Sequence, residues 1–143
     1  MMPRTLALIP WLLAVPCATA TAATCTVSTA GVAFGSYDPF ASQPLDSVGS
    51  ITVHCDTTTS YSATLSPGNG SFGNRLMKDG SHTLAYNLYV DTTRVTVWGD
   101  GSGTTSVQSG TSDTPLPVYG RILAGQNAYV GAYTDTIVVT VTL

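Results

Sequence analysis

The segment GSITVHCD, residues 49–56, alternates apolar and polar side chains and is the clearest secondary-structure signal in the chain. One face would carry Ile51, Val53 and Cys55, and the other would carry serine, threonine and histidine. A period of two residues is typical of a β-strand that has one buried and one solvated face. The segment therefore predicts a half-buried strand.

The same period recurs between clusters of Gly, Pro, Asn, Asp and Ser, which are typical of turns. Further runs of this kind occupy residues 25–37, 61–66, 84–90, 95–98, 118–122 and 136–143. We expect residues 100–117 to form a long loop, because Pro115 and Pro117 disfavour a central strand. About six or seven strands and no helical periodicity predict an all-β, immunoglobulin-like antiparallel sandwich.

The composition supports a single exported β-domain. The chain has 143 residues, a length that suits one domain, and only 9% of them are charged, with no glutamate and one lysine. Long amphipathic helices need such residues on their solvent face, so the chain is poorly supplied to build them. A net charge of −3 argues against a nucleic-acid partner, and 43% hydrophobic residues argue against disorder.

Residues 1–23 have the layout of a secretory signal peptide. Arg4 precedes an apolar run from Leu6 to Val15, and Ala-x-Ala cleavage patterns follow. The apolar run is about ten residues long, half of what a membrane-spanning helix needs. A lipid-modified Cys17 is less favoured, because Pro16 stands where a small residue is expected. We expect a mature domain at residues 24–143 that meets the membrane only through its signal peptide.

Removal of the signal peptide leaves two cysteines, Cys25 and Cys55. In an oxidising compartment the simplest outcome is one disulfide bond between them. Two reduced, buried thiols are the alternative. Zinc binding is less favoured than either, because neither a CxxC pattern nor a histidine pair supplies further ligands.

Residues for catalysis or cofactor binding are sparse. The G-x-G-x-x-G pattern at residues 68–73 precedes another turn rather than a helix, so we expect a β-hairpin loop and not a dinucleotide site. His54 and His82 are expected at the surface, and Asp100 lacks neighbouring oxygen ligands for calcium. The sequence predicts a protein that is not an enzyme, with no catalytic residue, cofactor or metal site.

Two strands carry less common features. Tyr86 and Tyr89 fall on opposite faces of one strand, which predicts one ring in the core and one at the surface. Gly120 next to Arg121 would permit another chain or a ring to approach closely. A carbohydrate site that uses Trp98 or Tyr89 remains an alternative.

Seven short motifs in fixed order resemble the spore coat U domain family, which includes pilins of archaic, Csu-type chaperone–usher pili. The motifs span essentially the whole mature chain. They are Phe34-Gly35-x-Tyr37-Asp38-Pro39, Gly49-x-Ile51-x-Val53-x-Cys55, Arg75-Leu76-Met77, Leu84-x-Tyr86-x-Leu88-Tyr89-x-Asp91, Trp98-Gly99-Asp100-Gly101, Tyr119-Gly120-Arg121-Ile122 and Gly131-x-Tyr133-x-Asp135-Thr136.

The resemblance implies a sandwich that lacks its last strand and exposes an apolar groove. A periplasmic chaperone would lend a strand to this groove. At the outer-membrane usher, the N-terminal extension of a neighbouring pilus subunit would replace it. The protein would then pass through the periplasm to a fimbria or coat at the cell surface. The groove residues we expect, on the first and last strands, are Val27, Val32, Phe34, Ile137, Val139 and Val141.

The resemblance fits a subunit that receives a strand better than one that gives it. The chain reaches Leu143 directly after its last strong strand, and only one or two residues would separate the cleavage site from Cys25. A donor strand needs roughly ten extended residues. We therefore expect a terminal position in a pilus, most plausibly the tip. The alternative is a secreted surface- or carbohydrate-binding module that folds alone.

Overall fold

The computed structural model describes residues 16–143, so the apolar run predicted at Leu6–Val15 lies outside the described residues. The described part contains eight β-strands and no helix. The strands are β1 (Cys25–Ala30), β2 (Leu45–Cys55), β3 (Ser60–Leu65), β4 (Arg75–Asp79), β5 (His82–Tyr89), β6 (Gln108–Thr111), β7 (Leu116–Ile122) and β8 (Val139–Thr142). Within this part, no helix is long and apolar enough to cross a membrane.

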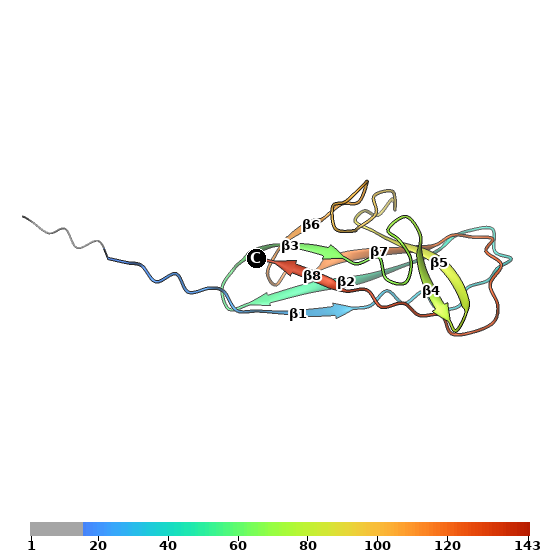
Figure 1. Ribbon diagram of the computed structural model, residues 1–143, viewed down its shortest axis with the longest axis horizontal. Helices are drawn as coiled ribbons and strands as arrows, with labels where there is room; N and C mark the ends of the chain where they lie inside the picture. The colour runs from blue at the N-terminus through green and yellow to red at the C-terminus, as the bar shows by residue number, and fades with distance from the viewer. Residues whose placement is uncertain (1–15) are drawn as a thin grey trace, which may run out of the picture.

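The strands form two antiparallel sheets that pack into a sandwich. One sheet has five strands in the order β1-β2-β7-β5-β4, and the other has three in the order β6-β3-β8. β1, β2, β3, β7 and β8 run along the long axis of the molecule, and residues 16–24 extend away from one end (Figure 1). The predicted all-β sandwich is thereby confirmed.

The core lies between the two sheets and follows from the alternation in the sequence. Ile51 and Val53 of β2 are buried, as the period of two predicts, and Val118 and Ile122 of β7 pack beside them. The remaining buried apolar residues are Tyr61, Ala63, Leu65, Met77, Leu84, Tyr86, Leu88 and Trp98.

A buried arginine joins the two sheets at one end of the core. Arg75, the first residue of β4, has no exposed surface. Its guanidinium donates to Oδ1 of Asn87 at 2.7 Å, to the carbonyl oxygen of Trp98 at 2.7 Å and to that of Ser66 at 2.9 Å. The ring of Phe72 also lies 5.5 Å from the guanidinium carbon. Burial lowers the pKa of Arg75 from its ordinary value. The positive charge is accommodated because each of these oxygens accepts a bond from it.

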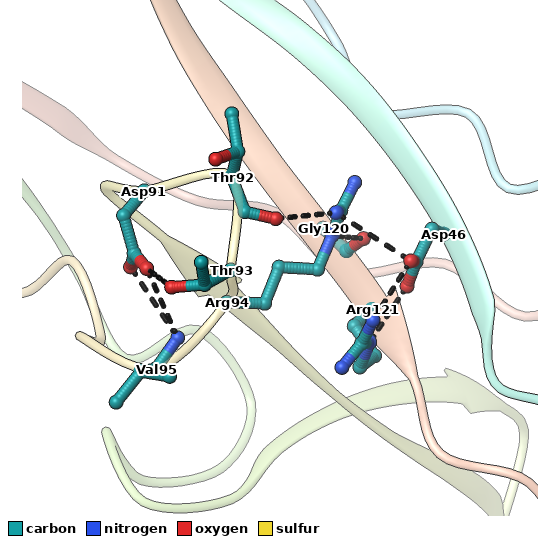
Figure 2. A network of polar contacts seen from close by, with 8 residues as sticks. All are labelled: Asp46, Asp91, Thr92, Thr93, Arg94, Val95, Gly120 and Arg121. Atoms are coloured by element: carbon teal, nitrogen blue, oxygen red, sulfur yellow. Dashed lines mark hydrogen bonds and ion pairs between the residues drawn. The ribbon is translucent and has the colours of Figure 1, made fainter.

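The strand predicted at residues 95–98 does not form. The backbone N–H group of Val95 donates instead to the Asp91 carboxylate (Figure 2). The N–H group of Thr96 donates to the same carboxylate, which closes a tight loop. Arg94 has a φ of 55°, which an extended strand cannot contain. Within residues 16–143, this segment forms only isolated bridges, Tyr89–Val97 and Trp98–Ser106.

Two predictions about loops are also wrong. The loop expected at residues 100–117 contains β6, and Pro117 lies within β7, a strand between β2 and β5. Pro117 is tolerated because β7 pairs with β5 only from Tyr119 onwards, so β7 is an edge strand at the proline. The glycine-rich loop after Leu65 is not a hairpin, since it connects β3 of one sheet to β4 of the other.

A disulfide bond ties the first residue of β1, Cys25, to the last residue of β2, Cys55. The two residues also face each other in the antiparallel register of these strands. The disulfide predicted from the cysteine count is therefore present, and it fixes β1 to the sheet at one end.

Candidate functional site

The sandwich is open along one side. β1 is the outer strand of the five-stranded sheet and pairs with β2, and β8 is the outer strand of the three-stranded sheet and pairs with β3. In the part of the chain that the structure describes, neither strand has a partner on its other edge. An unpaired edge exposes backbone N–H and C=O groups that another strand could use.

The first side of the opening, which we call the β1 wall, consists of residues 25–37. Val27 lies opposite the buried Val53 and so faces the interior, yet 47% of its surface is exposed because no strand covers it. Beyond Ala30 the wall continues through Val32 and Phe34, which pack against the core. Within residues 16–143, no backbone–backbone hydrogen bond involves residues 31–37.

The opposite side, the β8 wall, consists of residues 133–142. It is held to the sandwich at two points besides β8 itself. Thr134 exchanges two backbone hydrogen bonds with Lys78 of β4, at 2.8 and 3.0 Å. Val138 bonds to both the backbone and the hydroxyl of Ser66, at 3.0 and 2.9 Å. Every second residue of this wall is half-buried and faces inward, namely Tyr133, Asp135, Ile137, Val139 and Val141.

Between the walls lies a groove with an apolar floor, which consists of two adjoining cavities. The first has a volume of about 340 Å³ and reaches Ile51, Leu65, Leu88 and Val118 of the core. The second has a volume of about 500 Å³ and extends past Pro39 towards the loop at residues 128–133. The cavities share four lining residues, Val32, Phe34, Met77 and Tyr133.

The six groove residues predicted from the sequence all lie on the walls of this opening. Val32 and Phe34 of the β1 wall line the first cavity together with Ile137 and Val139 of the β8 wall. Val27 and Val141 do not line a cavity. They lie further along the strands, where β1 and β8 continue the two walls.

Sequence reasoning missed most of the other lining residues, among them Tyr133, Asp135 and Tyr86. Tyr133 and Asp135 have the same alternation as Ile137, so an extension of the run at residues 136–143 by three residues towards the N-terminus would have found them. For Tyr86 and Tyr89, the sequence predicted one ring in the core and one at the surface, without saying which. Tyr86 is a buried ring that also reaches the groove.

A hydrogen bond between two side chains, those of Tyr86 and Asp135, crosses the groove. The hydroxyl of Tyr86 donates a 2.7 Å hydrogen bond to Oδ2 of Asp135, whose Oδ1 accepts bonds from the backbone N–H groups of Asn69 and Thr136. Burial, and then the bond to this carboxylate, raise the pKa of Tyr86 far above its ordinary value. Within residues 16–143, Asp135 is the only charged side chain that lines either cavity.

Neither described histidine lines either cavity, although His82 contacts Tyr129, which lines the second one. His54 is 53% exposed, and its Nδ1 lies 2.9 Å from Oδ1 of Asp113. Its Nε2 lies 3.4 Å from the hydroxyl of Ser28. The ring of His82 stacks on Tyr129, with 4.2 Å between the centroids. No group of three His, Cys, Asp or Glu side chains that could hold a metal ion is found in residues 16–143.

Trp98 cannot take part in the carbohydrate site considered from the sequence. Its side chain has no exposed surface, and its indole N–H donates to the carbonyl oxygen of Ala63 at 2.9 Å. Tyr89 of β5 is half-buried and is paired with Tyr119 of the neighbouring strand β7. The tryptophan is therefore a core residue, and that part of the prediction is wrong.

Near this tyrosine pair, a charged network ties the loop after β5 to the sheet (Figure 2). Asp46 accepts two hydrogen bonds from Arg121, at 2.7 and 2.9 Å, and lies 3.5 Å from the guanidinium of Arg94. Arg94 also donates to the carbonyl oxygen of Gly120 and lies over the ring of Tyr119. The bond from Arg121 lowers the pKa of Asp46. The charges of Asp46, Arg94 and Arg121 are paired with one another, so we interpret the network as structural support for this loop.

Comparison with known proteins agrees with this architecture. A family model described as the Spore Coat Protein U domain matches residues 12–140. Protein U of Myxococcus xanthus is 36% identical over 124 residues, which cover 76% of this chain and 69% of Protein U.

A solved structure shares the fold. It is titled as a pre-assembly complex of the chaperone CsuC and the tip adhesion subunit CsuE, from archaic chaperone–usher Csu pili of Acinetobacter baumannii. The TM-score is 0.59 at 24% identity, and the match covers 85% of this chain. It spans only 40% of the matched chain.

Proposed function

Because the chain belongs to the spore coat protein U domain family, we propose that it is a secreted structural subunit of a pilus or surface coat, completed by a β-strand from another polypeptide. The observation that carries this proposal is the open side between β1 and β8. Each of these strands has a free edge, and between them the groove reaches the core residues Ile51 and Leu65.

Strand addition suits this groove for two physical reasons. Residues 31–37 make no backbone–backbone hydrogen bond within residues 16–143, so their backbone groups could form the hydrogen bonds of a new antiparallel or parallel ladder, although the carbonyl oxygen of Ala33 already accepts from Ser47. The apolar floor would be covered at the same time, at a gain of about 25 cal/mol for each Å² removed from water. From Val27 to Phe34 the β1 wall is eight residues long, so a donor strand of about eight to ten residues would match it.

The partners follow from this mechanism. A periplasmic chaperone would fill the groove during transit, and an outer-membrane usher would exchange the chaperone strand for that of a neighbouring subunit. The match to a structure titled as a chaperone–tip adhesion subunit complex supports the first step. The final location is the cell surface, in a fimbria or coat.

We place the chain at a terminal position in such an assembly. Residues 16–24 consist of proline, cysteine, alanine and threonine. A donor strand instead needs larger apolar side chains at alternate positions, in order to fill cavities of several hundred Å³. Mass spectrometry of the mature N-terminus tests this placement. A mature chain that retained the apolar run Leu6–Val15 would contradict it.

Complementation in trans tests the central proposal. The probe is a ten-residue peptide with valine or leucine at alternate positions and threonine or lysine between them. A peptide of the same composition, scrambled so that the alternation is lost, is the control. We expect the secreted chain to aggregate or be degraded alone, and to become soluble and monomeric with the alternating peptide. A chain that is monomeric alone, and whose melting temperature neither peptide changes, would contradict the proposal.

A further inference from the structure

One residue of the groove floor contacts both walls. The ring of Tyr86 meets that of Phe34 on the β1 wall edge to face, with 6.0 Å between the centroids. Its hydroxyl donates to Oδ2 of Asp135 on the β8 wall at 2.7 Å. β5, which carries Tyr86, is fixed between β7 and β4. Tyr86 is therefore a rigid point from which the positions of both walls are set.

Asp135 is itself held from several directions. Its Oδ1 accepts from the N–H groups of Asn69 and Thr136, and Gly68 packs so closely that a Cβ there would lie 2.2 Å from Oδ2. The carboxylate thus fixes the β8 wall between its other two attachments, at Thr134 and Val138. Without the bond from Tyr86, Asp135 would keep its bond from Asn69 but lose its link to the groove floor.

We infer that Tyr86 and Asp135 are positioning residues, which hold the empty groove at the width that an incoming strand requires. This inference rests on the proposed function, and it adds the residues that prepare the groove for its occupant. A site that is ordered before binding does not have to be ordered by the ligand, so affinity is higher. If the link is broken, the apolar side chains of the β8 wall can move onto the exposed floor, because that removes apolar surface from water.

Hydrogen exchange of the full chain tests the ordering of the wall. Tyr86→Phe keeps the ring against Phe34 and removes only the hydroxyl. Tyr89→Phe, on the same strand, is the matched control, since the hydroxyl of Tyr89 makes no hydrogen bond within residues 16–143. We expect Tyr86→Phe to speed exchange of the amides of Thr134 and Val138 by about tenfold or more, as loss of a bond to a charged group implies. Amides of β2 and β7 should be unchanged, which separates local loosening from general destabilisation.

Binding of the alternating ten-residue peptide tests the consequence. We expect Tyr86→Phe and Asp135→Asn each to weaken binding by about tenfold, and the double variant to be no weaker than either single one, because each eliminates the same hydrogen bond from the tyrosine hydroxyl to a charged carboxylate. Tyr89→Phe should bind like the wild type. A variant that aggregates when free is tested as a fusion, in which the peptide is joined to the C-terminus through a cleavable linker. After the linker is cleaved, the rate at which the peptide dissociates gives the same ranking of the variants.

The outcomes separate the inference from the proposed function. A wild-type chain that does not bind the peptide contradicts the proposed function. If the wild type binds and Tyr86→Phe binds equally well with unchanged exchange of the β8 wall, only the positioning role is contradicted.

Discussion

The ring of Phe34 lies against Gly120 of β7 so closely that a Cβ on this glycine would stand 2.7 Å from Cζ of Phe34. The same Cβ would lie 2.6 Å from Cγ1 of Val32. The backbone of β7 thus forms the surface on which the β1 wall rests. The sequence had suggested that Gly120 would allow a ring to approach, and it does.

Gly120→Ala should therefore displace the β1 wall. We expect a loss of about 1–3 kcal/mol in the free energy of unfolding, as for other overpacked sites, together with weaker binding of the alternating peptide. Urea unfolding and a peptide titration measure the two effects. Gly73→Ala is the control, since nothing lies within 4 Å of the added carbon, and it should change stability by less than about 0.5 kcal/mol. Equal effects of the two substitutions would contradict the packing argument.

Arg75→Met should be among the most damaging single changes. It leaves the carbonyl groups of Ser66 and Trp98 and the side-chain oxygen of Asn87 without their buried donor. We expect a loss of about 3–5 kcal/mol, because each buried acceptor left without a donor costs about 1–3 kcal/mol. Arg121→Met, which breaks a partly exposed pair with Asp46, should cost no more than about 1 kcal/mol. Chemical unfolding of both variants would show whether burial sets the difference.

Replacement of both Cys25 and Cys55 by alanine should destabilise the chain through its unfolded state. The disulfide closes a loop with a sequence separation of 30, for which the chain-entropy model gives about 3–4 kcal/mol. Thermal unfolding with and without a reducing agent provides the measurement. The reductant should lower the melting temperature of the wild type and leave that of the double variant unchanged. A reductant effect of the same size in both would point to a different cause.

The pH dependence of stability should include a contribution from Asp46. Its pKa is lowered in the folded state, chiefly by the hydrogen bond from Arg121, so its stabilising effect is complete above the unfolded pKa of about 3.9. The effect is lost as the pH falls through the lower, folded-state pKa. The pair is partly exposed, so the contribution is at most about 1 kcal/mol. Asp46→Asn should thus be less stable than the wild type at pH 6, and the gap should close towards pH 2. A gap that is constant across this range would rule out the ionised carboxylate as its source.

Much of the fold could be predicted because apolar and polar residues alternate along several strands. β2, β3, β5 and β7 each show a period of two, and the motif order indicated the family. β4 was missed because its first residue, Arg75, faces inward. A search for alternating apolar residues assigns an arginine to the solvent-exposed face. Only the distant partners of this arginine, such as Asn87 and Trp98, explain its burial.

The remaining differences depend on contacts that no local pattern contains. Val95 and Val97 suggest a strand, but the Asp91 carboxylate accepts hydrogen bonds from two backbone N–H groups of this segment. The sequence predicted the groove residues on two short runs, at residues 25–37 and 136–143. The Tyr86–Asp135 bond joins residues 49 positions apart, so only the folded chain shows it.

The direction of the strands has a mechanical consequence for any fibre built in this way. β1 and β8 both run along the long axis of the molecule (Figure 1). A segment seated between them would lie parallel to that axis. A pull along the fibre would then shear the whole ladder at once instead of opening it bond by bond. The geometry of the open side therefore favours an attachment that resists tension.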